Sequence, residues 1–108
     1  MGTRRTPEVE AWLAEHAGEL VGPVRLMVDH GVDWPVWTDA GALPAGEPPV
    51  SPGLHAELVA WCELFARGNA RPEEGWAGAD VRRAFVRQGR GLQRRLSAEL
   101  DLDVQLRV

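Results

Sequence analysis

The segment VRLMVD, residues 24–29, alternates apolar with polar side chains, and LDVQLRV, residues 102–108, repeats this alternation. A period of two places the apolar side chains of each segment on one side, which is typical of a strand with a single buried face. Residues 34–37, WPVW, can form a short return strand, which Pro35 would confine to an edge or a bulge. The sequence therefore predicts a small two- or three-stranded sheet.

Three stretches with the 3.6-residue period of an amphipathic helix surround these strands, at residues 7–20, 52–67 and 81–100. Residues suited to cap a helix stand before them: Thr6, Ser51 and Asp80. A sheet this small needs such helices to cover its apolar face. We therefore predict an α+β fold with the helices on one face of the sheet, in the order α-β-(β)-α-α-β.

The 108 residues are enough for one hydrophobic core. We predict a single α+β domain over residues 23–108, preceded by an N-terminal helical extension over residues 1–22. We predict loops for residues 43–52, which hold four prolines, and for residues 69–79.

The composition indicates an ordinary folded protein, with 44% apolar and 26% charged residues. We find no apolar stretch suited to a membrane span or a leader segment, so we expect a cytoplasmic protein with no membrane contact. The net charge of −4 weighs against a dedicated nucleic-acid binder. The lysine-free basic set fits coding from a GC-rich genome and is not by itself a sign of phosphate recognition.

Candidates for catalysis or metal binding are few. Cys62 is the only cysteine, which excludes an internal disulfide and a cysteine-based zinc site, and its place on an apolar helix face predicts an inert thiol. His16 and His55 are isolated in sequence, and no serine lies in a nucleophile-elbow motif. We therefore expect no catalytic residue, no metal and no cofactor, and the sequence favours a non-enzymatic role.

One turn, DHGVD at residues 29–33, collects acidic and imidazole side chains where the first strand ends. Carboxylates beside a histidine can move a proton or hold a small ligand, and two tryptophans follow closely. The same residue types are also common in any strand-ending turn. A small-ligand binder or enzyme is therefore one alternative function, and its residues would be Asp29, His30, Asp33, Trp34 and Trp37.

The third helix carries the strongest electrostatic feature. Arg83, Arg87, Arg90 and Arg94 follow at i, i+4, i+7 and i+11 and form one stripe opposite the apolar face. Such a stripe suits an acidic protein surface, and it also supports a second alternative, weak binding of nucleic-acid phosphates. A third interpretation is structural, namely a solvated helix face.

The first helix offers an internal partner for this stripe, because Glu8, Glu15 and Glu19 form an acidic stripe of their own. Within the third helix, Gly89 falls on the buried side. Its missing side chain would let a tryptophan approach closely, at a helix-propensity cost of about 1 kcal/mol. We therefore expect close packing at Gly89 and not an arginine-glycine RNA-binding tract.

Five tryptophans are many for a chain of this size. Trp12 and Trp61 belong to apolar helix faces, whereas the other three fall in the return strand or in loops: Trp34, Trp37 and Trp76. We expect at least two of these three to fill the core. Any exposed one would be a partner anchor, because tryptophan is favoured at binding hot spots.

The succession of VRLMVDHGVDWPVW, SPGLHAELVAWCELF and GRGLQRRLSAEL resembles a family of small actinobacterial proteins with a VRLMxDxGxxWPxW-type motif, over roughly residues 23–108. The matching positions are Arg25, Leu26, Met27, Asp29, Gly31, Trp34, Pro35, Trp37, Leu58, Trp61, Gly89, Arg90, Leu92 and Leu96. No activity is established for that family, so the resemblance implies the architecture and transfers no functional residues.

These observations favour a protein-interaction or regulatory module, such as an adaptor, a regulator or an immunity-type protein that neutralises a toxin. The predicted partner is another protein or a second copy of the chain. The predicted partner-binding residues are Arg83, Arg87, Arg90, Arg94 and Trp76.

Overall fold

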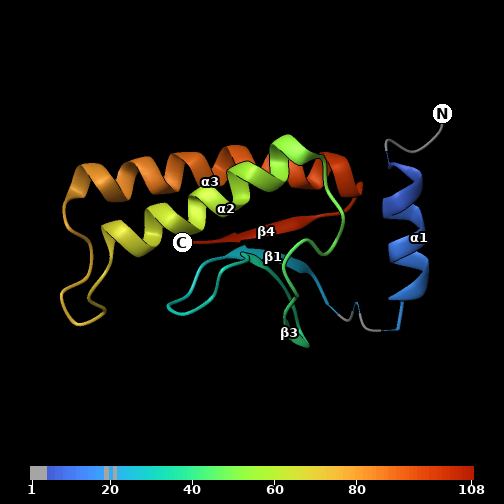
Figure 1. The fold of residues 1–108 in the computed structure, drawn as a ribbon, viewed down its shortest axis with the longest axis horizontal. Coiled ribbons are helices and arrows are strands. Elements are labelled where there is room, and N and C mark those ends of the chain that lie inside the picture. The colour runs from blue at the N-terminus through green and yellow to red at the C-terminus, as the bar shows by residue number, and fades with distance from the viewer. Residues whose placement is uncertain (1–4, 19, 21) are drawn as a thin grey trace.

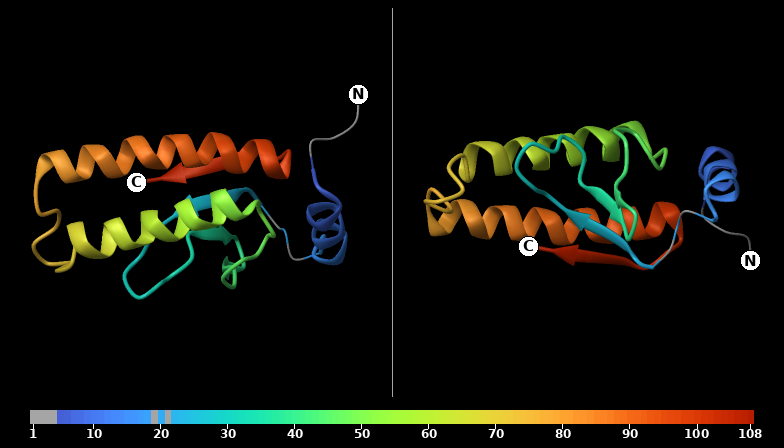
Figure 2. Two further views of the ribbon diagram at one scale, coloured as in Figure 1. Left: turned by 45° about the horizontal axis from the view of Figure 1, so that its top comes forward. Right: turned by 90° about the horizontal axis from the view of Figure 1, so that it is seen from below.

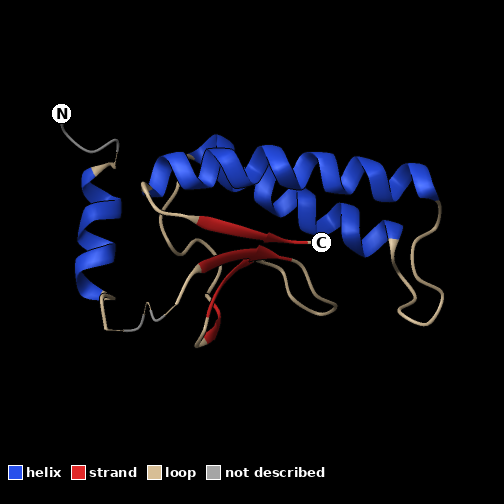
Figure 3. Ribbon diagram, turned by 180° about the vertical axis from the view of Figure 1, so that it is seen from behind, coloured by secondary structure: helices blue, strands red, loops and turns tan. Residues whose placement is uncertain are grey.

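The computed structural model describes residues 5–18, 20 and 22–108 and confirms the predicted α+β class (Figure 1). In chain order the elements are α1 (Pro7–Glu15), β1 (Val24–Met27), β2 (Val36–Thr38), β3 (Gly41–Ala42), α2 (Pro52–Gly68), α3 (Ala79–Leu100) and β4 (Val104–Arg107). The predicted order of helices and strands is confirmed, with one additional short strand (Figure 3).

The four strands form one mixed sheet in the order β3-β2-β1-β4. β1 is antiparallel to β2 and parallel to β4, and its Leu26 lies opposite Val36 on one side and Leu106 on the other. β3 pairs antiparallel with β2. Its two residues are too few to show a period of two, so the sequence predicted only a turn around Gly41.

The predicted edge position of residues 34–37 is wrong. β2 begins at Val36 and lies between β3 and β1, so strands flank it on both sides. Pro35 stands just before the strand, where its missing N–H removes no bond of the ladder. Its carbonyl oxygen accepts a hydrogen bond from the Met27 N–H at 2.9 Å. The proline is thus accommodated at the start of an inner strand.

Helices α2 and α3 lie side by side over one face of the sheet, as predicted (Figure 2). The core between the two layers contains Leu26 and Val36 from the sheet and Leu58, Trp61 and Leu96 from the helices, all fully buried. Burial of apolar surface is the main favourable term in folding. This core therefore fixes which side of each helix faces inward.

A tryptophan of α2 packs against Gly89 of α3, as predicted. A Cβ atom at Gly89 would lie 2.7 Å from Cζ2 of Trp61 and 3.2 Å from Cδ1 of Leu106. The Trp61 ring stacks on Phe85 with 4.4 Å between ring centroids, and its Nε1–H donates to the Phe85 carbonyl oxygen at 2.9 Å. Glycine leaves the room that this ring needs.

Helix α1 lies across one end of the two-layer body (Figure 1). Thr6 caps it as predicted, because its hydroxyl oxygen accepts a hydrogen bond from the Val9 N–H at 3.2 Å. The helix ends at Glu15, five residues before the predicted end, and a turn through Gly18, a poor helix former, follows it. Val9 belongs to the core, and the division of the chain after residue 22 stays a prediction.

Side-chain hydrogen bonds hold α1 against the body. Trp12 Nε1–H donates to Glu47 Oε1 at 2.9 Å, and Arg5 Nε–H donates to the Leu100 carbonyl oxygen at 2.6 Å. Leu100 ends α3, where the last carbonyl oxygens of a helix have no partner within the helix. Arg5 therefore satisfies one of these carbonyl oxygens and links the residues just before α1 to the C-terminal end of α3.

Helix α3 begins at Ala79, with Gly78 at its N-cap and not the predicted Asp80. Gly78 has an extended backbone and provides no side-chain cap. Asp80 lies instead in the first turn, where the helix dipole favours a carboxylate, and it pairs with Arg83. Asp80 thus stabilises the start of the helix from within it.

Gly89→Ala and Gly91→Ala form a matched pair that tests the packing of α2 on α3. Alanine favours a helix over glycine by about 1 kcal/mol. At Gly91 a Cβ atom would meet Arg94 Nη2 at 4.0 Å, so we expect the free energy of unfolding to rise by up to about 1 kcal/mol. At Gly89 the clash with Trp61 outweighs this gain, and we expect a loss of about 1–2 kcal/mol. Urea denaturation measures both, and equal effects at the two sites would contradict the packing.

Candidate functional site

The outer face of α3 carries an arginine stripe, which consists of Arg83, Arg87, Arg90 and Arg94. All four side chains are exposed, whereas the opposite face of the helix is buried in the core. The helical period explains this arrangement, because positions three or four residues apart share a face. The exposed stripe that the sequence predicted is confirmed as a feature of the surface.

Most of the stripe is without a counter-charge in the part of the chain that the structure describes. Arg83 pairs with Asp80 one turn earlier. Among the described residues, no ion pair is formed by Arg87, Arg90 or Arg94. Their positive charge is therefore available to a partner.

The acidic residues of α1 do not neutralise the stripe within the part of the chain that the structure describes. Glu10 pairs with Arg5, with 4.0 Å between Oε2 and Nη1. Glu8 and Glu15 form no ion pair with α3 there, and Glu19 lies outside the described residues. The two helices thus do not show the internal pairing that the sequence allowed.

A shallow hollow of about 470 Å³ lies among the stripe side chains. Its lining comes from α3 alone: Arg82, Arg83, Val86, Arg87, Arg90 and Arg94. One guanidinium group can donate two parallel hydrogen bonds to a carboxylate or a phosphate. The hollow therefore presents several such donors around the half-buried Val86.

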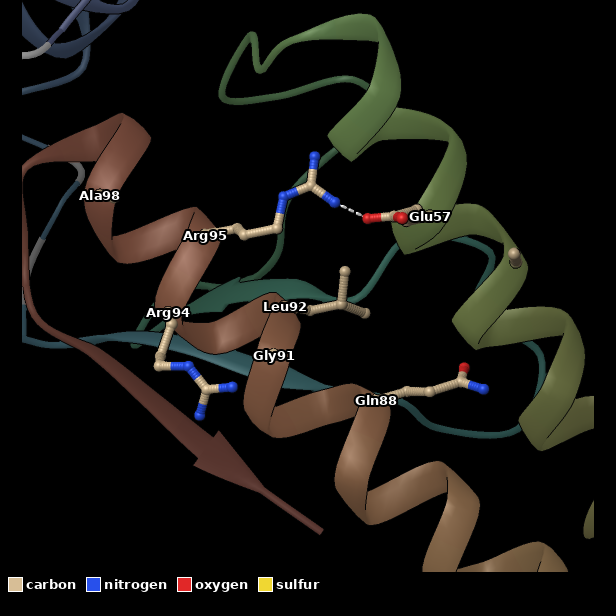
Figure 4. Close-up of a pocket in the computed structure, with 8 residues that line it drawn as sticks. Glu57, Gln88, Gly91, Leu92, Arg94, Arg95 and Ala98 are labelled. Atoms are coloured by element: carbon tan, nitrogen blue, oxygen red, sulfur yellow. Dashed lines mark ion pairs between the residues drawn. The ribbon is translucent and has the colours of Figure 1, made fainter.

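A second and larger hollow, the α2–α3 groove, lies between the two helices (Figure 4). It has a volume of about 700 Å³ and is lined by Glu57, Ala60, Gln88, Gly91, Leu92, Arg94, Arg95 and Ala98. Arg95 and Glu57 form an ion pair from one helix to the other, whereas Arg94 points away from α2. Arg94 lines both hollows, so the groove and the stripe adjoin.

Sequence reasoning did not identify the α2–α3 groove. Its signal on α3 is the pair Gly91 and Ala98, which are seven positions apart and therefore share a helix face. Its other wall comes from Ala60, some thirty residues earlier in the chain. Only the pairing of the two helices brings these small residues together.

Trp76, the remaining predicted anchor, lines neither of these hollows. Its ring packs edge-on against Phe65, with 5.7 Å between centroids, and lies 4.8 Å from the Phe85 ring. The side chain is half-buried. The structure thus places Trp76 against the core just before α3 and leaves part of its surface open.

The turn after β1 lines a pocket with α2. Asp29, His30 and Asp33 face Cys62 across this pocket, which has a volume of about 350 Å³. The backbone N–H of His30 donates to Asp29 Oδ1 at 2.8 Å, and His30 Nε2 lies 2.8 Å from the carbonyl oxygen of Asn69. The structure therefore brings together three of the five residues predicted for a ligand site.

The structure does not bring Trp34 and Trp37 into this pocket. Trp34 is buried, and its Nε1–H donates to the Glu47 carbonyl oxygen at 2.8 Å. Trp37 is half-buried, and its Nε1–H donates to the Met27 carbonyl oxygen at 2.9 Å. Among the described residues, no group of three or more His, Cys, Asp and Glu side chains is placed to hold a metal ion.

A model of the Serratia CdiI immunity protein-like family matches residues 23–108, which include everything from β1 to β4. The chain belongs to this family. The immunity-type class predicted from the sequence is therefore confirmed at the level of the family. No curated protein matches the chain. The resemblance to actinobacterial proteins through the VRLM and WPVW segments stays a prediction.

The part of this immunity protein-like chain that the structure describes contains no helix long and apolar enough to cross a bilayer. The match includes the arginine stripe, the α2–α3 groove and the turn pocket, and it excludes α1. All three candidate surfaces therefore lie in the part of the chain that the family model matches.

Cys62 is buried in the wall of the turn pocket, as its helix face predicted. Burial raises the pKa of the Cys62 thiol from 9.0 to about 11, and the carboxylates of Asp33 and Glu63 add to this because they oppose a second negative charge. The thiol therefore stays protonated at neutral pH and is a poor nucleophile.

We expect Cys62 in the folded chain to react with iodoacetamide at pH 8 about a hundredfold more slowly than a thiol of ordinary pKa, because each pKa unit lowers the thiolate fraction about tenfold. Mass spectrometry of the alkylated protein measures the rate, and the chain in concentrated urea is the control. Equal rates in the two states would contradict the protonated, buried thiol.

The same pKa makes stability depend on pH. Since folding raises the pKa, the protonated Cys62 thiol makes its full contribution to the free energy of unfolding below pH 9.0. This contribution is lost as the pH rises through about 11. The chain has no lysine and no tyrosine, so few other groups titrate in this window. The free energy of unfolding should fall over this range in the wild type, and Cys62→Ala should remove most of the fall.

Proposed function

We propose that this chain is an immunity protein that binds and neutralises a toxin, and that the arginine stripe contacts an acidic surface of that toxin. The carrying observation is that three exposed arginines, which form no ion pair among the described residues, lie on one helix of a member of an immunity protein-like family. The family supports the immunity role, and the charge arrangement supports the choice of surface.

The charge of the stripe differs from that of the chain as a whole. The net charge is −4, yet six of the twelve basic residues lie in α3. Opposite charges on two proteins accelerate their encounter and discriminate against wrong partners. The stripe would therefore select an acidic partner and orient the chain on it.

The backbone beneath the stripe is held by the core, because α3 packs on both α2 and β4. A preformed helix loses little backbone entropy on binding, so most of the ordering cost is limited to the arginine side chains. Arginine is also among the residues enriched at interface hot spots. Trp76, half-buried just before α3, is the predicted apolar contact at the same end of the helix.

Two other predictions compete with this proposal. Nucleic-acid phosphates would also be attracted by the stripe, and a steep decline of RNA affinity with salt would identify them. A small ligand would use the turn pocket, to which Trp34 and Trp37 do not contribute. The proposal favours a protein partner because the family is one of immunity protein-like chains.

The double variant Arg87→Glu/Arg90→Glu tests the surface. Reversing two central charges of the stripe places like charges against an acidic toxin, so we expect binding to weaken at least about a hundredfold. Candidate toxin domains, taken from the genes that adjoin this one, are the probes, with titration calorimetry for affinity and growth of toxin-producing cells for protection.

Arg71→Glu is the matched control, because Arg71 is an exposed arginine in the loop between α2 and α3. We expect it to bind and protect as the wild type does. Both variants should keep the wild-type melting temperature within a few degrees, since exposed charges contribute little to stability. Wild-type affinity of the double variant would refute the stripe as the contact surface, and a wild-type chain that gives no protection would refute the immunity role.

A further inference from the structure

The α2–α3 groove is apolar inside and charged at its rim. Leu92 is a buried residue of α3 that forms part of the lining, and the side chains beside it are short: Ala60, Gly91 and Ala98. Arg94 and Arg95 stand on the α3 side of the rim (Figure 4). The hollow exists because small residues on both helices leave the space above Leu92 unfilled.

The size and shape of the groove suit a side chain from outside. Its volume of about 700 Å³ lies within the range of sites that hold small molecules, so it has room for a large side chain together with the groups beside it. Ala60 and Ala98 are exposed, so the groove opens to solvent. A bulky apolar side chain placed there would be removed from water against Leu92, which is a favourable transfer.

The charged residues at the rim of the groove determine which charge the partner should carry beside that apolar side chain. Arg94 has no ion pair among the described residues and is shared with the hollow of the arginine stripe. Arg95 is held by Glu57, and both side chains are about half exposed, at 45% and 56%. A carboxylate from a partner can therefore pair with Arg94, and it can also replace Glu57 as the partner of Arg95. A basic group could compete for Glu57 in the same way, but Arg94 and Arg95 would both repel it, so two arginines against one glutamate favour a carboxylate.

We infer that the α2–α3 groove receives a bulky apolar side chain from a segment of the toxin in which acidic residues flank that side chain. This inference rests on the proposed function and specifies the partner's chemistry. The flanking carboxylates contact Arg94, Arg95 and the arginine stripe, while the apolar side chain fills the groove. The partner surface is thus acidic with one apolar anchor, and not acidic throughout.

A pair of acidic peptides tests the inference without the toxin. Both peptides have the same length and the same number of glutamates, and they differ only in a central residue, leucine in one and serine in the other. We expect the leucine peptide to bind the wild-type chain about tenfold more tightly in fluorescence anisotropy at low salt, because only leucine gains from the groove. Amide shifts of Gly91 and Leu92 in NMR spectra should move with the leucine peptide and much less with the serine peptide.

Two alanine substitutions on α2 provide the matched variants. Ala60→Leu places a bulky apolar side chain inside the groove, whereas Ala56→Leu adds the same side chain at an exposed position that does not line it. We expect Ala56→Leu to keep the tenfold preference for the leucine peptide and Ala60→Leu to lose it while still binding the serine peptide. Circular dichroism should show both variants folded, and Gly91→Leu is a second way to fill the groove.

The outcomes separate this inference from the proposed function. Equal affinities of the two peptides for the wild type, or a preference that survives Ala60→Leu and Gly91→Leu, would overturn the apolar anchor and leave the arginine stripe unaffected. Failure of both peptides to bind would overturn the acidic segment as well. Protection from the toxin is measured separately, so its loss alone would count against the proposed function.

Discussion

Trp61 lies where α2, α3 and β4 meet, and much of the fold depends on its place there. Its ring stacks on Phe85 and occupies the space above Gly89, which Leu106 of β4 also approaches. Its indole N–H is satisfied by a carbonyl oxygen of α3, so the buried ring leaves no polar atom without a partner. One side chain thus fixes the distance between the two helices, and the sheet packs beneath them.

This inward arrangement determines what the outward faces can do. Once Phe85, Gly89 and Leu92 face the core, the helical period leaves Arg87, Arg90 and Arg94 on the solvent side. None of these arginines is needed to hold the fold by an ion pair within the described residues. The scaffold and the proposed binding surface therefore depend on different residues of the same helix, and selection can change the one without disturbing the other.

The sequence predicted well wherever a feature was local and periodic. The strands around Leu26 and Leu106, the helix faces and the space at Gly89 all follow from patterns within one segment. Two of the local differences between prediction and structure have separate causes. β3 is too short to show a pattern, and Asp80 has a residue type and a position that suit an N-cap equally well.

Features built from distant segments could not be predicted in this way. The α2–α3 groove needs Ala60 beside Gly91, and the turn pocket needs Asp33 beside Cys62. Proximity in sequence was even misleading for Trp34 and Trp37, because neither side chain lines the turn pocket and the indole N–H groups of both bond to backbone carbonyl oxygens. The family match selected the immunity type from the three interaction classes that the sequence analysis left open, because no motif in the chain distinguishes them.

The parallel pairing of β1 with β4 has a consequence for how the chain folds. Val24 lies opposite Val104, so the pair joins positions 104 − 24 = 80 residues apart. Contacts between such distant positions close a long loop and slow folding, because the entropy of the intervening chain is lost first. Until β4 arrives, β1 is an unpaired edge that another chain can extend, which makes the unfinished sheet prone to aggregation. The last strand therefore completes the core and takes the place of β1 as the edge of the sheet.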